Sequence, residues 1–226
     1  MAFGPFRPGD PAPHFALPAV NREGQVSLGD YRGRSPVLVG LFRGLHCPFC
    51  RRQLVQLGTT QEKLKALGVE TVAVVNTPLE RAQLYFKYRP ARMLLAADPE
   101  AATHRAFRVP AGVFVEDEAA TSWPHRATLG QVQAVLINPT GELPAPQNAF
   151  AANETLNQLD GFEPTEIDQQ IATAHGTQLV GHFLIDRAGI IRWRQIEAGE
   201  RIGDLGTFPS DEEILAAARG LPSPPS

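Results

Sequence analysis

Apolar runs and helical periodicities alternate along the first half of the chain. Three runs rich in aliphatic residues fit strands buried on both faces, at positions 35–42, 69–76 and 92–99. After the first run, leucines recur at helical spacing from residue 54 to residue 67, and Gly68 ends the predicted helix. Further helices are predicted over 78–90, which prolines bound, and over 100–107. This alternation predicts a mostly parallel sheet covered by helices.

Shorter apolar runs predict hairpins outside this alternating core. Segments 15–17 and 25–28 flank a turn at 21–24 and predict a small N-terminal β-hairpin. Residues 182–197 predict a stronger hairpin with its turn at 186–189, and residues 130–143 predict a strand, a turn at 139–141 and a candidate second strand. Near the end of the chain, Ser210 is placed to cap a helix that Gly220 ends.

The pattern loosens between the two halves of the fold. Residues 113–178 offer few apolar side chains of their own; 143–162 is polar and rich in turn formers, and 164–176 predicts one helix. We therefore interpret residues 1–226 as a single domain that carries an insertion or elaboration at about 113–178.

Composition narrows the functional class. The chain is 43% hydrophobic and 20% charged with a net charge of −3, which gives no electrostatic reason to expect nucleic acid or an anionic membrane as a partner. No apolar run approaches the length of a membrane span, and the first residues lack the pattern of a secretory signal. Two cysteines cannot form a disulfide framework for 226 residues, so we expect a cytoplasmic protein with reduced thiols.

Both cysteines lie in the stretch GLFRGLHCPFCRR, where the first predicted strand meets the first helix. Positions i and i+3 in the first turn of a helix share a face, so the sulfurs of Cys47 and Cys50 can come close together. The unpaired N–H groups of a helix start favour an anion, and Pro48 suits the first helical position. We expect Cys47 to be the exposed nucleophile and Cys50, one turn further in, to be the more buried resolving partner.

Basic residues surround the two thiols in the sequence. Arg43, His46 and Arg51 are candidates for stabilising a thiolate, and Arg52 adds charge beside them. Each also has a plainer interpretation, with His46 as an exposed spectator and the arginines as charges on the helix surface.

Zinc is the main chemical rival to redox chemistry. A structural zinc site needs four ligands, and only His46 stands close in the sequence to Cys47 and Cys50. The other five histidines are scattered singly, and no phosphate loop, serine nucleophile elbow or HExxH motif is present. We therefore expect neither a metal nor an organic cofactor.

The chain resembles the thioredoxin-fold, peroxiredoxin-like redoxins of the alkyl hydroperoxide reductase and thiol-specific antioxidant family. The resemblance lies in the segments RPGDPAPHFALPAVNREGQVSLGDYRG, PVLVGLFRGLHCPFCRRQL and HFLIDRAGIIRWRQIEAG, in that order. It implies an α/β, thioredoxin-like three-layer fold with a central mixed sheet, helices on both faces, an N-terminal β-hairpin and an insertion before the last hairpin.

The chain also departs from that family. Peroxiredoxins carry a threonine three positions before the peroxide-attacking cysteine and a proline seven before it, where this chain has Gly44 and Gly40. The family's active-site arginine aligns with Val180. Conversely, the CPFC pair is similar to the thioredoxin and glutaredoxin dithiol, whereas the cis-proline that thioredoxins place before the late strand is absent from Leu179–His182.

Taken together, the resemblance implies a thiol-dependent oxidoreductase in which Cys47 attacks a disulfide or a peroxide and Cys50 resolves the product. An external reductant of the thioredoxin or glutathione type would restore the dithiol, and a homodimer is compatible with the sequence. Two alternatives stay open: a redox-sensing or partner-binding module without turnover, and a zinc protein that uses Cys47, Cys50 and His46.

Overall fold

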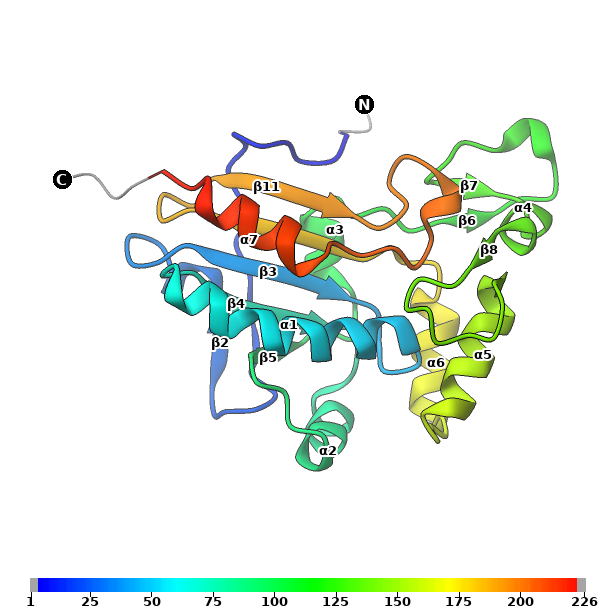
Figure 1. Cartoon of the computed structure of the whole chain (residues 1–226), viewed down its shortest axis with the longest axis horizontal. Coiled ribbons are helices and arrows are strands. Elements are labelled where there is room, and N and C mark those ends of the chain that lie inside the picture. Colours follow the sequence, from blue (N-terminus) through cyan, green and yellow to red (C-terminus); the bar gives the residue numbers. More distant parts are fainter. Residues whose placement is uncertain (1–3, 223–226) are drawn as a thin grey trace.

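The computed structural model describes residues 4–222, which form a layered α/β fold (Figure 1). Its strands are β1 (Ala16–Pro18), β2 (Gln25–Ser27), β3 (Val37–Phe42), β4 (Glu70–Val75), β5 (Leu94–Ala97), β6 (Val113–Phe114), β7 (Arg126–Ala127), β8 (Leu136–Ile137), β9 (Gln147–Asn148), β10 (Gly181–Ile185) and β11 (Ile191–Ile196). Its α-helices are α1 (Pro48–Ala66), α2 (Leu79–Tyr88), α3 (Ala102–Ala106), α4 (Leu129–Ala134), α5 (Ala149–Leu159), α6 (Glu166–His175) and α7 (Asp211–Arg219). Short 3-10 turns cover Leu28–Asp30, Glu118–Ala120 and Ile202–Asp204.

The central sheet has five strands in the order β11-β10-β3-β4-β5. Strands β3, β4 and β5 are parallel, whereas β10 is antiparallel to both β3 and β11. Every residue of β3 is buried, which explains the uninterrupted apolar run in the sequence. The predicted mixed sheet, the N-terminal hairpin β1–β2 and the late hairpin β10–β11 are confirmed.

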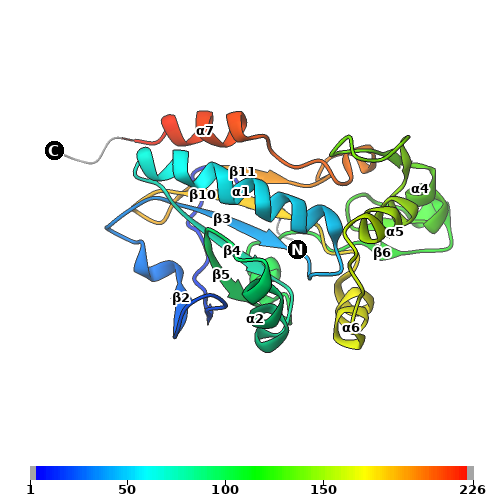
Figure 2. The same cartoon turned by 60° about the horizontal axis from the view of Figure 1, so that its bottom comes forward.

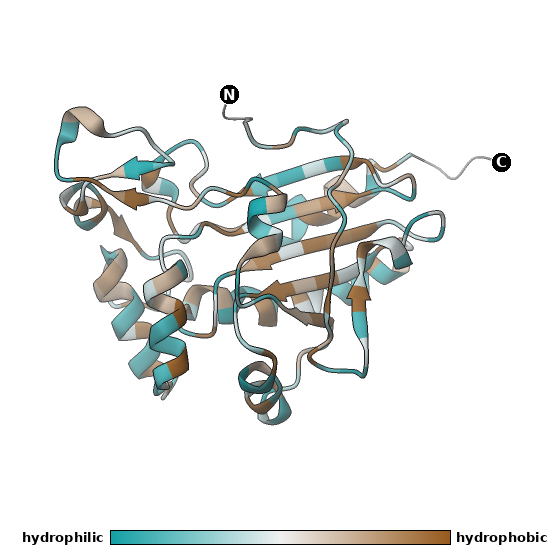
Figure 3. Ribbon diagram, turned by 180° about the vertical axis from the view of Figure 1, so that it is seen from behind, coloured by the Kyte–Doolittle hydropathy of each residue, from teal (hydrophilic) through white to brown (hydrophobic). Residues whose placement is uncertain are grey.

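Two hydrophobic layers cover the faces of this sheet. Helices α1, α2 and α7 pack on one face through buried apolar side chains, among them Leu57, Phe86 and Ile214. The other face carries the N-terminal hairpin and the segment after α3, with Phe15 and Phe107 in its core. Figures 2 and 3 show these layers, with hydrophobic positions concentrated on the central strands. The three-layer prediction is thus confirmed.

Local signals fix the ends of α1, the helix that carries the dithiol. Cys47 is its N-cap, Pro48 occupies its first turn, and Lys63 and Lys65 lie near the negative end of the helix dipole. Gly68 follows with φ of +72°, a left-handed conformation that glycine adopts without a side-chain clash. The helix therefore begins directly after Cys47, which places Cys50 in its first turn.

Residues 113–178 lie beyond the carboxyl ends of β3 and β4, beside the first turn of α1 (Figures 1 and 2). Of the strand predicted before the turn in 130–143, only β8 forms, because Thr128 and Gln131 form a capping box that begins α4 ahead of it. Helix α5 was also not predicted from the polar segment 143–162. Asn148 caps it, and its apolar contacts are limited to a narrow face that includes Ala152 and Leu156.

No helix among residues 4–222 has the length and apolar character needed to cross a membrane.

Candidate active site

The two cysteines meet at the first turn of α1. The backbone N–H of Cys50 donates a hydrogen bond to Sγ of Cys47 at 3.2 Å, so the Cys47 sulfur occupies the position of a helix cap. Both residues are free thiols. This is the geometry that favours a thiolate on the first cysteine, because a helix N-terminus presents unpaired N–H donors and positive potential.

The environment separates the acidities of the two thiols. Burial raises the pKa of Cys47, but the hydrogen bond from the Cys50 side chain and the charge of Arg43 lower it by more. The resulting pKa of Cys47 is about 6. Burial and the neighbouring Cys47 raise the pKa of Cys50 well above its usual value. At neutral pH the pair therefore holds one thiolate, on Cys47, and one thiol, on Cys50.

Both sulfurs are shielded from solvent. Cys47 is 2% exposed and Cys50 is 1% exposed, so the expectation of an exposed Cys47 is wrong. Ala152 and Leu156 of α5, within the insertion, belong to the same hydrophobic cluster as the cysteines. The side chain of Asn157 also donates to the carbonyl of His46 at 3.5 Å. We therefore expect a small reagent or a substrate to reach Cys47 only through local opening of the structure around it.

Arg43 lies at the end of β3, directly before the dithiol turn. Its guanidinium donates to Oε1 of Glu197 at 2.8 Å and to the carbonyl of Gln178 at 3.2 Å. Burial lowers the pKa of Arg43, but the negative groups Cys47 and Glu197 raise it well above its ordinary value. The structure thus brings the predicted cation and the thiolate together.

His46 carries no charge at neutral pH. Burial and the nearby charge of Arg43 lower its pKa to about 4, and neither ring nitrogen has a hydrogen-bond partner. The positive charge that a protonated imidazole would offer to the thiolate is therefore missing. The backbone carbonyl of His46 accepts a hydrogen bond from Asn157 of α5.

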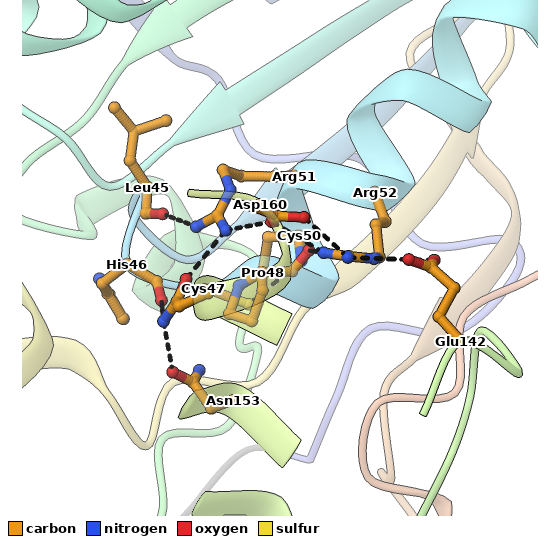
Figure 4. Close-up of polar contacts among 11 residues, drawn as sticks. Leu45, His46, Cys47, Pro48, Cys50, Arg51, Arg52, Glu142, Asn153 and Asp160 are labelled. Carbon is orange, nitrogen blue, oxygen red and sulfur yellow. Dashed lines mark hydrogen bonds and ion pairs between the residues drawn. The ribbon is translucent and has the colours of Figure 1, made fainter. Parts of the chain in front are cut away.

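Arg51 contacts the insertion and the loop before α1. Its guanidinium donates to the carbonyl of Leu45, to the side chain of Asn157 and to Asp160, and it lies 4.1 Å from the ring centre of Phe162. Figure 4 shows these contacts, in which the guanidinium of Arg51 connects the loop before α1 with the end of α5. Arg51 therefore fastens the insertion over the dithiol.

Arg52 adds a second fastening at the same place. It donates to both carboxylate oxygens of Asp160, at 2.9 and 2.8 Å, and forms a two-point contact with Glu142 (Figure 4). Residues 113–178 contain nine acidic side chains and a single basic one, Arg126, so opposite charge draws this segment towards the arginines of α1. Burial raises the pKa of Asp160, but the bonds from Arg52 and Arg51 lower it below its ordinary value.

Sequence reasoning missed Glu197 and Asp160, the two carboxylates that bind the arginines of the site. Neither is close in sequence to the cysteines, and no spacing rule connects them to Arg43 or Arg51. The only available signal was the abundance of acidic residues within 113–178 opposite a pair of adjacent arginines.

The glycines at the departures from the family pattern are tightly enclosed. A Cβ on Gly44 would lie 2.6 Å from the carbonyl oxygen of Asn76 and 2.9 Å from Cγ2 of Ile171. A Cβ on Gly40 would lie 2.6 Å from the ring of Phe42. Neither position has room for a side chain. Val180, at the place of the family's arginine, is fully buried and donates its N–H to Glu197 at 3.1 Å.

The zinc alternative would require metal-binding side chains that lie close together. Within the part of the chain that the structure describes, no group of three or more histidine, cysteine or acidic side chains is arranged to hold an ion.

Comparison with known proteins shows the family and the fold of the chain. A model of the AhpC/TSA family matches residues 8–145. A search of curated protein sequences found no significant match. Among solved structures, the peroxidoxin BcpB of Mycobacterium tuberculosis is similar with a TM-score of 0.57 and 13% identity over 96% of this chain and 99% of that one. The reduced 2-Cys peroxiredoxin of Plasmodium vivax has a TM-score of 0.56 and 15% identity over 93% of each chain. The thiol:disulfide interchange protein DsbE of Chlorobium tepidum has a TM-score of 0.50 and 22% identity over 94% of this chain and 99% of that one. At these identities the structural likeness shows the thioredoxin-like fold.

Proposed function

The chain belongs to the AhpC/TSA family of thiol oxidoreductases, and from this premise we propose that Cys47 is its nucleophile and Cys50 its resolving thiol. One observation carries the proposal: the Cys50 N–H bond to Cys47 Sγ, in a site where the pKa of Cys47 is lowered and that of Cys50 is raised. A nucleophile that is ionised at neutral pH, beside a partner that keeps its proton, is what a two-step exchange requires.

With a disulfide substrate, the Cys47 thiolate attacks one sulfur, the substrate S–S bond breaks, and the leaving thiolate takes up a proton. Cys50 then loses its proton and attacks the Cys47 sulfur of the mixed disulfide. The second thiol product leaves, and a Cys47–Cys50 disulfide remains. The substrate is reduced by two electrons, which the dithiol supplies.

With a hydroperoxide substrate, the Cys47 thiolate attacks the terminal oxygen and the O–O bond breaks, releasing an alcohol or water after proton uptake. The resulting sulfenic acid condenses with Cys50 to give the same disulfide and one water. Enclosed glycines replace the threonine and proline of standard peroxiredoxins, while Arg43 supplies a guanidinium beside the sulfur. Both substrate classes therefore belong to the proposal.

In either case an external dithiol or thiol, of the thioredoxin or glutathione type, must reduce the Cys47–Cys50 disulfide again. We place this cycle in the cytoplasm, where such reductants are abundant, and allow for a homodimer. Because Cys47 is buried, every turnover also requires residues 113–178 to move away from the dithiol.

Parallel assays separate the two substrates. Rapid consumption of hydrogen peroxide by the reduced protein, followed by stopped flow, would assign a peroxidase; turnover only with small or protein disulfides would assign a reductase. No turnover with either class would contradict the proposal.

The burial of both sulfurs favours one alternative: a redox sensor or partner-binding module in which oxidation of the dithiol alters the packing of residues 113–178. A dithiol that is oxidised slowly, exchanges with no substrate, and changes the proteolysis of this segment would support the sensor and exclude the enzyme.

A further inference from the structure

Glu197 is a buried carboxylate directly after β11 that forms a salt bridge with Arg43. It is 1% exposed. Its Oε1 accepts hydrogen bonds from Arg43 at 2.8 Å and from the N–H of Gly206 at 2.8 Å, and its Oε2 accepts from the N–H of Val180 at 3.1 Å. Glu197 and Arg43 therefore form a buried ion pair that is fixed to the backbone of two separate segments.

This arrangement restricts the position of Arg43. One terminal nitrogen of its guanidinium bonds Glu197 and the other bonds the carbonyl of Gln178, so both ends of the fork are anchored. Gln178 is itself held, because its buried amide donates to the carbonyl of Pro110 at 2.8 Å. With both ends tied, the guanidinium can turn little, and it interacts with the Cys47 sulfur from this fixed position.

We propose that Glu197 is a positioning residue of the thiol site, which holds the Arg43 guanidinium against the Cys47 sulfur. The inference rests on the proposed role of Cys47 as the nucleophile. In this arrangement the cation that stabilises the thiolate comes from the end of β3, and the carboxylate that aims it comes from the end of β11.

Glu197 acts on Cys47 in two opposite directions. Its own negative charge raises the pKa of Cys47, whereas its hold on Arg43 keeps in place a charge that lowers this pKa. The ionisable groups with the largest effect on Cys47 are Cys50 of α1, Arg43 directly after β3 and Glu197 directly after β11. Arg43 also contributes to the lowered pKa values of His46 and His104, so both imidazoles are neutral and add no charge near neutral pH.

Two substitutions separate these effects. Glu197→Asp keeps the charge but shortens the side chain by one methylene, so it loses its hold on Arg43, and the pKa of Cys47 should rise by about one unit. Glu197→Gln keeps an oxygen that can accept from Arg43 but removes the charge, and the pKa should fall. The pH dependence of the alkylation rate of Cys47 in the reduced full-length protein measures both. Glu200, exposed and three residues further on, provides matched controls: Glu200→Asp and Glu200→Gln should leave the pKa unchanged.

Shifts of opposite sign in the two Glu197 variants support the inference. Unchanged pKa values, or shifts of the same sign, overturn the inference but leave the proposed function standing. The proposed function would be contradicted by a different result, a wild-type Cys47 pKa near that of free cysteine. If the Glu197 variants do not fold, Arg43→Lys answers the same question. Lysine keeps the charge but lacks the fork that spans Gln178 and Glu197, so the pKa should rise, and an unchanged value overturns the inference.

Discussion

The backbone N–H of Cys50 lies 3.2 Å from the sulfur of Cys47 and donates to it, which makes the first cysteine the cap of the helix that carries the second. The relationship is asymmetric, since only Cys47 gains the backbone donor. It explains why two identical side chains, three positions apart, differ in acidity and can take different parts in one reaction.

Substitution of each cysteine by serine should give different results. Cys47→Ser should abolish turnover, because the attacking sulfur is lost. In the Cys50→Ser variant, Cys47 should still attack a disulfide substrate once, and the reaction should stop at the mixed disulfide. Steady-state turnover and intact-protein mass spectrometry measure the two outcomes. Full turnover in Cys47→Ser, or a mixed disulfide that forms on Cys50, would assign the roles differently.

Asp160→Asn should make Cys47 more accessible. The substitution weakens the contacts of Arg51 and Arg52 with the end of α5. If these charge-assisted bonds are together worth about 1.5 kcal/mol, the alkylation rate of Cys47 rises roughly tenfold, since labelling proceeds through local opening. The rate should be measured well above the pKa of Cys47, so that ionisation does not limit it.

Glu154→Gln is the matched control for Asp160→Asn. Glu154 lies on the same helix, and its hydrogen bond is with the nearby Gln158 on that helix. It should leave the alkylation rate unchanged. Equal rates in Asp160→Asn and in the parent protein would mean that these ion pairs do not limit access.

Gly44→Thr, which restores the threonine of standard peroxiredoxins, should not create a better peroxidase. Its Cβ would lie 2.6 Å from the carbonyl oxygen of Asn76, a backbone atom that cannot move freely. We expect a loss of about 1–3 kcal/mol in the free energy of unfolding, measured with urea, and no gain in peroxide consumption.

Gly58→Ala is the control for Gly44→Thr. Its Cβ would meet only side-chain atoms, the nearest at 3.6 Å, within the interior of α1. Alanine should stabilise the helix by about 0.5–1 kcal/mol. A stable Gly44→Thr variant with faster peroxide consumption would show that the site can accept the family pattern.

The ion pair between Arg81 and Asp168 should make the packing of α6 depend on pH. Burial raises the pKa of Asp168, but the bonds from Arg81 and from Thr165 lower it below its ordinary value. The pair therefore stabilises the fold above the ordinary pKa of aspartate, and this contribution disappears as the pH falls through the lowered value. Arg81→Met should reduce the free energy of unfolding at neutral pH by about 3–5 kcal/mol, because it leaves a buried charge unpaired.

The cost of Arg81→Met should shrink in acid, where Asp168 becomes protonated in the variant. Arg201→Met is the control, because its pair with Asp204 is exposed and should contribute little. A cost of Arg81→Met that does not vary with pH would show that the ion pair is not its source.

The central sheet could be predicted from the sequence because its signals are local and strong. The all-buried run of β3, the leucine spacing of α1 and the cap at Ser210 each determine an element without help from distant residues. The start of α1 at Pro48 followed from the same kind of signal, and with it the juxtaposition of the two cysteines.

The insertion could not be predicted in this way, because tertiary contacts decide its structure. The β-branched residues near 132–137 favoured a strand, yet the capping box at Thr128 begins α4 first, and only Leu136–Ile137 form a strand. Cys47 is packed in one hydrophobic cluster with Ala152 and Leu156 of α5, and Arg43 is paired with Glu197, which is 154 residues away in the sequence. Neither hydrophobic periodicity nor residue spacing predicts contacts between residues so far apart in the sequence.

The pH dependence of Cys47 alkylation in the reduced wild-type protein tests the central claim most directly. The claim is that a helix cap and Arg43 hold this buried thiol ionised at neutral pH. The account predicts a midpoint at about 6. A midpoint at or above the value of free cysteine, about 8.5, would contradict it and mark the dithiol as a structural pair.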